Sequence, residues 1–416
     1  MPQGADVRFP GCESYRSPTK ELSSIKEIVI LGGARTPIGS FLGALSSFSA
    51  PKLGSVAIKC ALENSGVKPE QIQQVLMGNV LQAAIGQAPA RQAGIGAGIP
   101  VESGAVTINK VCGSGLKAVM YAANDIRCGE YDLAVAGGME SMSNAPYALP
   151  QARTGYRMGN GKMIDTMVHD GLWDPYGDKH MGNCAETCVA KYNFSRQQQD
   201  EFSLESYRRA QDATKNGKFK KEIAVVEIAS KKGTSVVVDD EEPFNAPLDK
   251  MGSLKPAFQK DGGTVTAANA SKINDGAAAL IVTSADYAAQ NGFKPMARIV
   301  AQGTAAQEPE WFTTAPAKAI DIVLRRAGMT IDDIDLFEIN EAFAAVALAA
   351  MVDAKIPHEK MNVHGGAVAL GHPIGASGAR ILVTLLHALE DRNLKRGMAA
   401  ICIGGGEAAA MIVERL

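Results

Sequence analysis

Short apolar runs alternate along the chain with segments in which apolar residues recur every three or four positions. Six runs have the length and the branched, apolar composition of buried strands, and they cover residues 27–31, 74–77, 132–136, 297–301, 336–339 and 398–403. Apolar positions within 116–126 and within 381–389 follow a helical period, so each segment predicts a helix that buries one face. This alternation predicts an α/β fold.

The surroundings of these two helices are alike, which indicates an internal duplication. Residues 106–139 run from a strand through Cys-Gly-Ser-Gly into a helix and then to a strand that ends in two glycines. Residues 362–407 repeat the order, from a strand through a Gly-rich loop and a helix to a strand that ends in three glycines. We therefore expect two similar halves.

The stretch between the halves is more polar and begins a helix with a capping box at Ser195 and Gln198. We interpret it as a lobe inserted over a site. We expect a flexible N-terminal extension over residues 1–25 and an N-terminal half in two pieces, 26–140 and 273–295. An inserted loop domain is expected over 141–272 and a C-terminal half over 296–416.

Composition and charge exclude several classes of protein. The 416 residues carry 42 Lys and Arg against 44 Asp and Glu, a formal charge of −2, so we expect no nucleic-acid partner. The longest apolar run, residues 342–352, is far shorter than the ~20 residues of a membrane span. The seven cysteines are odd in number and scattered, and we expect neither a secretory signal nor a transit peptide, which favours reduced thiols in the cytoplasm.

Cys112 stands before Gly-Ser-Gly at a predicted junction between a strand and a helix. The free N–H groups and positive dipole of a helix N-terminus favour the thiolate, so we expect a lowered pKa and a nucleophilic thiol. Residues 113–118 also match the dinucleotide pattern G-x-G-x-x-A, but several strands precede them, whereas that pattern normally follows the first strand. A nicotinamide-dependent dehydrogenase is therefore a weak alternative.

Three further positions carry candidate chemistry. His372 follows glycines with P-loop spacing, but it stands where a P-loop needs lysine, so we expect no nucleotide loop. Cys402 ends a strand and runs into three glycines, which suits a thiol beside exposed N–H groups. Asn340 follows another strand, and its plain interpretation is the N-cap of the next helix.

Cys184 and Cys188 lie one helical turn apart, near His180. Their spacing does not match a zinc site, so we expect no metal.

Five motifs in one order together resemble the thiolase family: Cys112-Gly-Ser-Gly, Gly-Gly-Met-Glu140, Asn340-Glu-Ala-Phe, Gly371-His372-Pro and Cys402-x-Gly-Gly-Gly. The resemblance is strongest to its biosynthetic, short-chain branch. It implies a duplicated βαβαβαββ core in five layers (α-β-α-β-α) with an inserted loop domain, and a homotetramer that is a dimer of dimers. It also implies a reversible Claisen condensation of two acetyl-CoA to acetoacetyl-CoA and CoA, with no metal or redox cofactor.

The resemblance implies a role for each motif residue. Cys112 matches the nucleophile that is acylated, His372 the residue that activates it, and Cys402 a second acid and base. Asn340 matches the residue that holds a water which, with His372, stabilises the thioester oxygen. The N–H groups of Cys112 and Gly404 match a second oxyanion hole.

The resemblance further implies a CoA and pantetheine channel lined by Leu172, His180, Met181, Ala257, Phe258, Ser271 and Phe343. Lys231 stands where related enzymes carry an arginine that faces the nucleotide end of CoA, and a lysine lacks the guanidinium fork. Glu407 replaces a glycine found in many members. Its carboxylate either disfavours the Cys402 thiolate or points outward, and the sequence leaves both open.

Two alternatives share most of these features. A degradative 3-ketoacyl-CoA thiolase of broader chain length has the same catalytic groups, but the pair His180-Met181 favours the short-chain type. A non-catalytic thiolase-like lipid carrier is disfavoured because all four catalytic side chains are present.

Overall fold

The computed structural model describes residues 26–231, 233–246 and 248–416. The predicted flexible extension, residues 1–25, lies outside the described residues, as does Cys12 within it. All six predicted strands are present, although β1 (Ile28–Arg35) and β5 (Leu133–Ser141) begin one residue later than predicted, and both predicted helices are confirmed.

The N-terminal half has the order βαβαβαββ, with its elements at β1 (Ile28–Arg35), α1 (Ala50–Ser65), β3 (Gln74–Gly78), α2 (Pro89–Gly96), β4 (Gly104–Ile108), α3 (Ser114–Cys128), β5 (Leu133–Ser141) and β12 (Asn274–Ser284). Its strands lie in the order β4-β3-β5-β12-β1. The first three are parallel, and β12 is antiparallel to both of its neighbours.

The C-terminal half repeats this order at β13 (Ala297–Ala306), α8 (Ala315–Ala327), β14 (Leu336–Ile339), α9 (Ala344–Ala354), α11 (Ile374–Asp391), β15 (Arg396–Ile403) and β16 (Glu407–Arg415). The strand expected near residue 362 is wrong as a full strand, because only one bridge joins Met361 to Phe337. The side chain of Asn362 pairs with the backbone instead, accepting from Ile339 N at 2.8 Å and donating to Ile339 O at 2.9 Å. These two hydrogen bonds satisfy backbone groups of β14 at the edge of the sheet.

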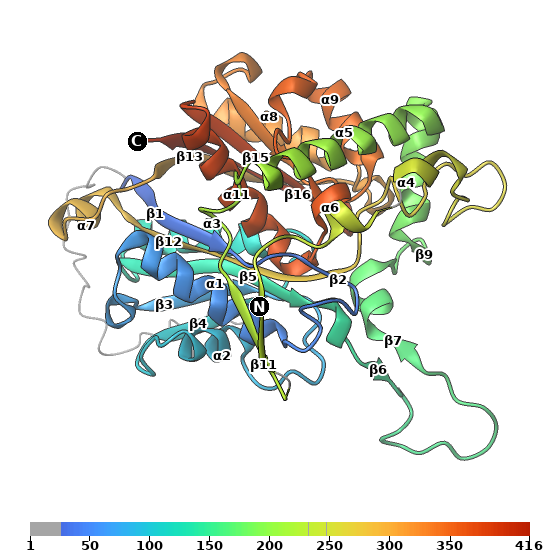
Figure 1. Ribbon diagram of the computed structural model, residues 1–416, viewed down its shortest axis with the longest axis horizontal. Helices are drawn as coiled ribbons and strands as arrows, with labels where there is room; N and C mark the ends of the chain where they lie inside the picture. The colour runs from blue at the N-terminus through green and yellow to red at the C-terminus, as the bar shows by residue number, and fades with distance from the viewer. Residues whose placement is uncertain (1–25, 232, 247) are drawn as a thin grey trace, which may run out of the picture.

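Five layers are visible in Figure 1. Helices α1 and α2 pack on the outer face of the first sheet, α3 and α11 lie between the sheets, and α8 and α9 pack on the outer face of the second. The duplicated five-layer fold is therefore confirmed. The two sheets also pair over two residues where β1 meets β13.

The two central helices approach closely at glycines. A Cβ on Gly115 of α3 would lie 2.7 Å from Ala379 N, and one on Gly378 of α11 would lie 2.4 Å from Leu116 N. Real Cβ atoms do not come this close, so only glycine permits the crossing. The crossing brings the N-termini of α3 and α11, with the motifs that precede them, to one place.

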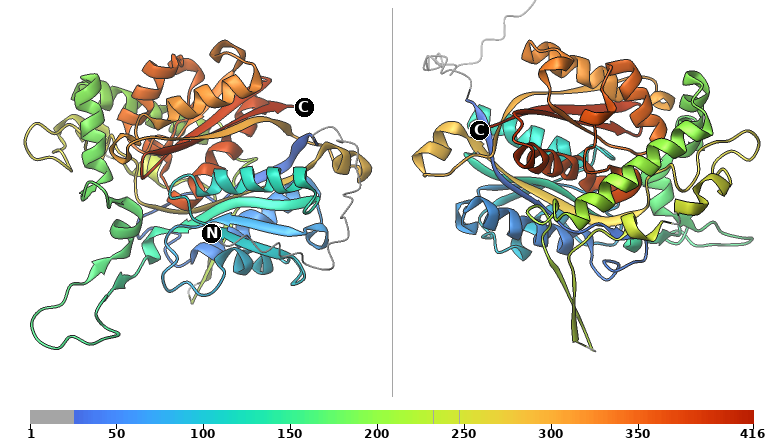
Figure 2. Two further views of the ribbon diagram at one scale, coloured as in Figure 1. Left: turned by 180° about the vertical axis from the view of Figure 1, so that it is seen from behind. Right: turned by 45° about the horizontal axis from the view of Figure 1, so that its top comes forward.

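The inserted lobe lies between β5 and β12 in the chain and contains β6 (Tyr147–Ala148), β7 (Ile164–Asp165), β8 (Trp173–Asp174), β9 (Lys179–His180), α4 (Met181–Tyr192), α5 (Arg196–Lys215), β10 (Val226–Ser230), β11 (Gly233–Val237) and α6 (Glu242–Asn245). The predicted capping box of Ser195 and Gln198 is confirmed at the start of α5. Figure 2 shows the β6–β7 loop and the β10–β11 hairpin extending away from the body.

The smaller elements are β2 (Gly39–Ser40), α7 (Ala285–Gln290), α10 (Ala367–Leu370) and a π-helical turn over Met167–Leu172. Over the described part of the chain, no helix combines the length and the apolar character needed to span a membrane.

Candidate active site

A largely apolar cavity of roughly 470 Å³ lies between the two halves and the inserted lobe. Ten of the thirteen site residues expected from the sequence line it: Cys112, Leu172, His180, Met181, Ala257, Phe258, Ser271, Phe343, His372 and Gly404. Asn340 and Cys402 are buried, and Cys402 belongs to the same apolar cluster as the wall residues Met181 and Phe343. Lys231 does not line the cavity; it lies in the exposed turn between β10 and β11, so its contact with CoA stays a prediction.

The turn before α3 presents Cys112. Val111 has a φ of +45°, which a β-branched residue rarely adopts and which costs on the order of 1–3 kcal/mol. Two neighbours hold this conformation: Asn109 Oδ1 accepts from Val111 N at 3.0 Å, and Ser114 Oγ donates to Val111 O at 2.6 Å. Ser114 Oγ also accepts from Lys110 N at 2.8 Å. The strain is stored directly beside the thiol.

The expectation of a lowered Cys112 pKa is wrong. Burial raises the pKa of this thiol to about 11 and outweighs the backbone N–H groups of Gly404 and of Cys112 itself, which face the sulfur and act in the opposite direction. The first residue of α3 is Ser114, so the thiol lies outside the first helical turn, where the dipole acts most strongly. The resting nucleophile is therefore a thiol, with two donors already directed at its position.

His372 is neutral and oriented. Its Nδ1 lies 2.6 Å from Ser377 Oγ, and that hydroxyl donates to Pro373 O at 2.9 Å. A serine has one hydroxyl proton, so Oγ must accept from Nδ1–H. Nε2 is then unprotonated, and it has no hydrogen-bond partner among the described residues. Burial, together with the charge of Arg380, lowers the pKa of His372 to about 3, so the imidazole is available as a base at neutral pH.

The second thiol, Cys402, lies at the end of β15 and is fully buried. Burial raises its pKa well above the usual value, and the nearby Cys112 adds to this, while the N–H of Ala342 faces the sulfur and acts in the opposite direction. The cavity is therefore lined by one thiol and one neutral imidazole, and a second thiol is buried in the apolar cluster behind its wall.

The interpretation of Asn340 as an N-cap is wrong, because Phe343 caps α9. The backbone N–H of Asn340 extends the sheet by donating to Ala400 O at 3.0 Å. Its buried side-chain amide has no partner for either atom among the described residues. Such an amide is available to a small polar group that enters the site.

Aromatic rings build the wall on the lobe side. Phe258 stacks on His180 with centroids 4.7 Å apart and meets the edge of Phe343 at 6.0 Å. Gly182 makes room for the Phe258 ring, since a Cβ there would lie 2.2 Å from it. His180 caps α4 by accepting from Gly182 N at 3.0 Å, so the ring that stacks is also fixed in orientation. These contacts make a rigid, apolar wall.

Glu407 points outward. Its carboxylate pairs with Lys110 Nζ, in the turn that presents Cys112. The groups that shift the pKa of Cys402 do not include Glu407. Of the two alternatives left open by the sequence, the structure supports the outward orientation.

Several positioning residues were missed from the sequence. Ser377 had only one signal, its place one turn into the helix after His372. Glu140 was part of a motif without a role; its carboxylate accepts from Asn79 Nδ2, Val80 N, Leu81 N and Gly375 N, and so ties the first turn of α11 to the end of β3. Asn274 Oδ1 accepts from His372 N at 2.9 Å.

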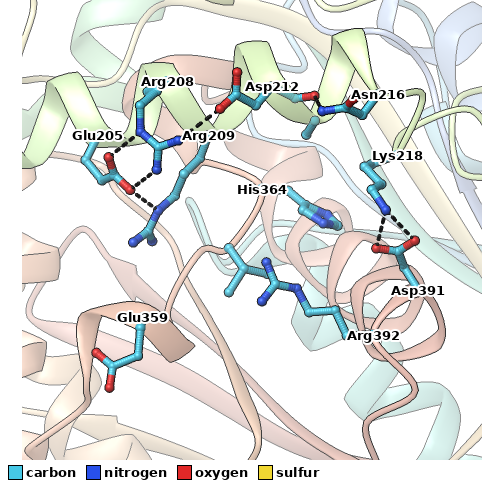
Figure 3. A pocket seen from close by; sticks show the side chains of 12 residues that line it. Glu205, Arg208, Arg209, Asp212, Asn216, Lys218, Glu359, His364, Asp391 and Arg392 are labelled. Atoms are coloured by element: carbon cyan, nitrogen blue, oxygen red, sulfur yellow. Dashed lines mark hydrogen bonds and ion pairs between the residues drawn. The ribbon is translucent and has the colours of Figure 1, made fainter.

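A second cavity, of roughly 540 Å³, lies between α5 and the C-terminal end of α11 (Figure 3). Its wall is charged, and the charges are largely paired within the protein: Arg208 with Glu205 and Asp212, and Lys218 with Asp391. No cysteine is among the residues that line it. The apolar cavity that Cys112 lines is therefore the better candidate for covalent chemistry.

Cys184 and Cys188 are buried in the apolar cluster beside Cys402. Within residues 26–231, 233–246 and 248–416, no group of three or more His, Cys, Asp or Glu side chains is placed to hold a metal ion.

The family models of the thiolase N-terminal domain and the thiolase C-terminal domain match residues 28–286 and 293–415. The chain is 51% identical over 402 residues to acetyl-CoA acetyltransferase 2 of Arabidopsis thaliana, a match that covers 96% of this chain and 99% of that protein. It is 52% identical over 391 residues to the acetyl-CoA acetyltransferase of Cupriavidus necator, covering 94% and 99%. The crystal structure of the Bacillus anthracis acetyl-CoA acetyltransferase superposes with a TM-score of 0.92 at 40% identity, covering 94% and 99%.

Proposed function

The chain belongs to the thiolase family, and on this premise we propose that it is an acetyl-CoA C-acetyltransferase. It condenses two acetyl-CoA to acetoacetyl-CoA and CoA, and it catalyses the reverse thiolysis. The observation that carries the proposal is an apolar cavity lined by Cys112 and by a neutral His372, whose Nε2 has no partner among the described residues. Cys402 is buried in the apolar cluster behind this wall.

In the first half-reaction, His372 Nε2 takes the proton of Cys112 as the sulfur attacks the acetyl carbonyl of acetyl-CoA. The carbon–sulfur bond to CoA breaks, CoA leaves as a thiol with a proton from Cys402, and acetyl-Cys112 remains. Because Cys112 is protonated at rest, this proton transfer accompanies binding and attack.

In the second half-reaction, the Cys402 thiolate removes a proton from Cα of a second acetyl-CoA. The enolate oxygen forms beside His372 and the amide of Asn340. The two polar atoms of that amide are buried and have no hydrogen-bond partner in the described part of the chain. The carbanion attacks the carbonyl carbon of acetyl-Cys112, and the N–H groups of Cys112 and Gly404 stabilise the tetrahedral oxygen. The carbon–sulfur bond to Cys112 then breaks, the sulfur takes back its proton from the imidazolium of His372, and acetoacetyl-CoA is released. No metal or redox cofactor takes part in these steps.

The aromatic wall of Phe258 and Phe343, with Met181 beside Gly404, supports a short acyl chain. A degradative enzyme of broad chain length is the alternative. Steady-state thiolysis with ketoacyl-CoA substrates of four to sixteen carbons separates the two. We expect kcat/KM to fall steeply beyond four carbons; similar values for four and twelve carbons would contradict the short-chain assignment.

Two further proposals concern assembly and location. The β6–β7 loop and its base expose apolar side chains at Tyr147, Leu149, Tyr156, Met158 and Met163, and such a surface favours burial between subunits, here in a homotetramer. Light scattering after size exclusion tests this.

The six described cysteines are free, which supports a reducing compartment such as the cytoplasm, although a mouse relative of 50% identity is named as mitochondrial. Fractionation of cells decides between them.

A further inference from the structure

A buried arginine of α11 contacts the strand that leads to Asn340. The side chains of Arg380 and Glu338 are both buried, and Nη1 of Arg380 lies 3.5 Å from Oε2 of Glu338. Arg380 lies one helical turn after Ser377, whose hydroxyl accepts from Nδ1 of His372 at 2.6 Å. One turn of helix and one hydrogen bond therefore connect the guanidinium to the catalytic imidazole.

Strand β14 presents Glu338 on the same face of the sheet as Asn340. Phe337 and Ile339 pack in the outer apolar cluster with α8 and α9. Because side chains alternate along a strand, Glu338 and Asn340 face the central layer instead, toward α11. The contact with the guanidinium therefore joins the two segments that meet at the enolate oxygen.

The charge of Arg380 is incompletely neutralised. Its Nε and Nη2, and Oε1 of Glu338, have no hydrogen-bond partner among the described residues. A second buried arginine, Arg35, is by contrast paired with Glu222 at 2.5 Å and with Asp240 at 2.7 and 2.9 Å. Burial raises the pKa of Glu338 to about 8, which further weakens its compensation of the guanidinium at neutral pH. A positive charge without a full counterion therefore lies inside the central layer.

Two other buried carboxylates act on this guanidinium but are engaged elsewhere. Burial lowers the pKa of Arg380, and besides its contact partner the carboxylates of Glu222 and Glu341 act in the opposite direction. Glu222 is paired with Arg35, and Glu341 accepts three hydrogen bonds from other groups. A buried charge with so little compensation costs free energy, so stability alone does not account for it.

The charge of Arg380 acts on one of the two places where negative charge develops in the proposed reaction. Together with burial, which has the larger effect, it lowers the pKa of His372. The groups that shift the pKa of Cys112 do not include Arg380. A positive charge that disfavours an imidazolium favours a negative oxygen beside the imidazole. Arg380 therefore affects the enolate more than the acetylation of Cys112.

We propose that Arg380 is a positioning residue for the enolate step: through Glu338 it holds the strand of Asn340 against α11, and its charge favours the negative oxygen that forms there. The proposal rests on the proposed function, because that reaction passes through an enolate. Enolate formation is measured separately from condensation, as exchange of the methyl hydrogens of acetyl-CoA with deuterated water.

The test replaces the pair by apolar side chains of similar size. Glu338→Leu combined with Arg380→Met removes both polar groups, and such a replacement of a buried ion pair often preserves stability. We expect the exchange of methyl hydrogens to slow roughly ten- to a hundredfold, the scale on which misplaced positioning groups act. Acetylation of Cys112 by acetyl-CoA, followed by mass spectrometry after rapid quenching, should not slow. General damage to the site would slow both reactions.

Two single variants are controls. Glu338→Gln is the conservative change, since its amide oxygen still accepts from Arg380 and the positive charge stays, so the exchange rate should be retained. Thr384 is buried one turn after Arg380 and donates to Glu222 at 3.1 Å. Thr384→Val therefore removes a polar contact from the same helix and should leave both rates unchanged. Thermal unfolding compares the stability of all variants.

Three results would overturn the proposal: normal exchange in the double variant, exchange and acetylation that fall by the same factor, or failure of both the double variant and Arg380→Met alone to fold. If the unmodified enzyme exchanges methyl hydrogens without forming acetoacetyl-CoA, and the double variant slows that exchange, the proposed function fails and the role of Arg380 stands. If the unmodified enzyme condenses acetyl-CoA and the double variant exchanges equally fast, the role of Arg380 fails and the function stands. Absence of exchange in the unmodified enzyme would overturn both.

Discussion

The imidazole of His372 donates from Nδ1 to Oγ of Ser377 over 2.6 Å, because the only proton of that hydroxyl is already given to a backbone carbonyl. This one contact selects the tautomer of the catalytic base and leaves its Nε2 free. A helix therefore contributes to the chemistry through a side chain that does not line the active-site cavity.

Replacing Ser377 with alanine removes the acceptor for Nδ1–H of His372, so the imidazole is no longer held in one tautomer. We expect both half-reactions to slow roughly ten- to a hundredfold, the scale on which residues that orient a functional histidine act. The pH profile of kcat/KM should change as well, which a purely structural loss would not cause. Ser203→Ala is the matched control, since Ser203 is equally buried and donates to Gln199 O in the same helical geometry. If the two variants lose activity equally, Ser377 has no special role.

The raised pKa of Cys112 predicts how the free enzyme reacts with alkylating agents. Only the thiolate reacts, so the rate of modification by iodoacetamide should rise about tenfold for each pH unit between neutrality and pH 9, without a plateau. The modification rate rises with pH because burial favours the neutral thiol until the pH approaches about 11. Mass spectrometry identifies the modified residue and follows its rate. A plateau near neutral pH would show a resting thiolate paired with an imidazolium ion.

Replacing each of the two thiols with a hydroxyl should abolish a different step of the reaction. Cys112→Ser should lose both directions, because a serine hydroxyl has a pKa too high for this histidine to make it comparably nucleophilic. Cys402→Ser should still take up one acetyl group on Cys112, detectable by mass spectrometry, but it should no longer exchange the methyl hydrogens of acetyl-CoA with deuterated water. Normal exchange in Cys402→Ser, or acetyl label on Cys402, would contradict this division of labour.

Asn340 should act on the enolate rather than on binding. Asn340→Ala should slow condensation by roughly 10²-fold or more, the effect of losing one donor to a developing oxyanion. The affinity for CoA should scarcely change, since the cavity wall is intact. Condensation rates and CoA binding by calorimetry check both parts, and normal turnover would leave Asn340 without a catalytic role.

The ion pair of Lys110 and Glu407 joins the turn that presents Cys112 to the strand that follows the three glycines. We expect Glu407→Gln to cost at most about 1 kcal/mol of stability, because the pair is partly exposed. Its main effect should be a several-fold slower acetylation of Cys112 as the two oxyanion donors move apart. The charge-swapped enzyme, Lys110→Glu with Glu407→Lys, should recover the rate. Glu390→Gln breaks the exposed pair with Lys221 and is the control.

Local patterns in the sequence determined the elements and their duplication. The helices α3 and α11 and the six strands predicted from apolar spacing were all confirmed. The spacing of apolar residues predicts them because a helix buries one face and a core strand buries most of its side chains. The motif residues could also be named, and most of them lie around one cavity. The third strand of the second half was mispredicted because the side chain of Asn362 takes over backbone hydrogen bonds.

The electrostatic properties of the site were decided only by the tertiary structure. A helix N-terminus suggested a reactive thiolate at Cys112, but desolvation by both halves and the lobe outweighs it. The ammonium of Lys272 contacts backbone carbonyls about a hundred residues apart in the chain, at Ala270 and Val368. Burial and long-range contacts depend on what packs from elsewhere in the chain, and local sequence does not specify these distances.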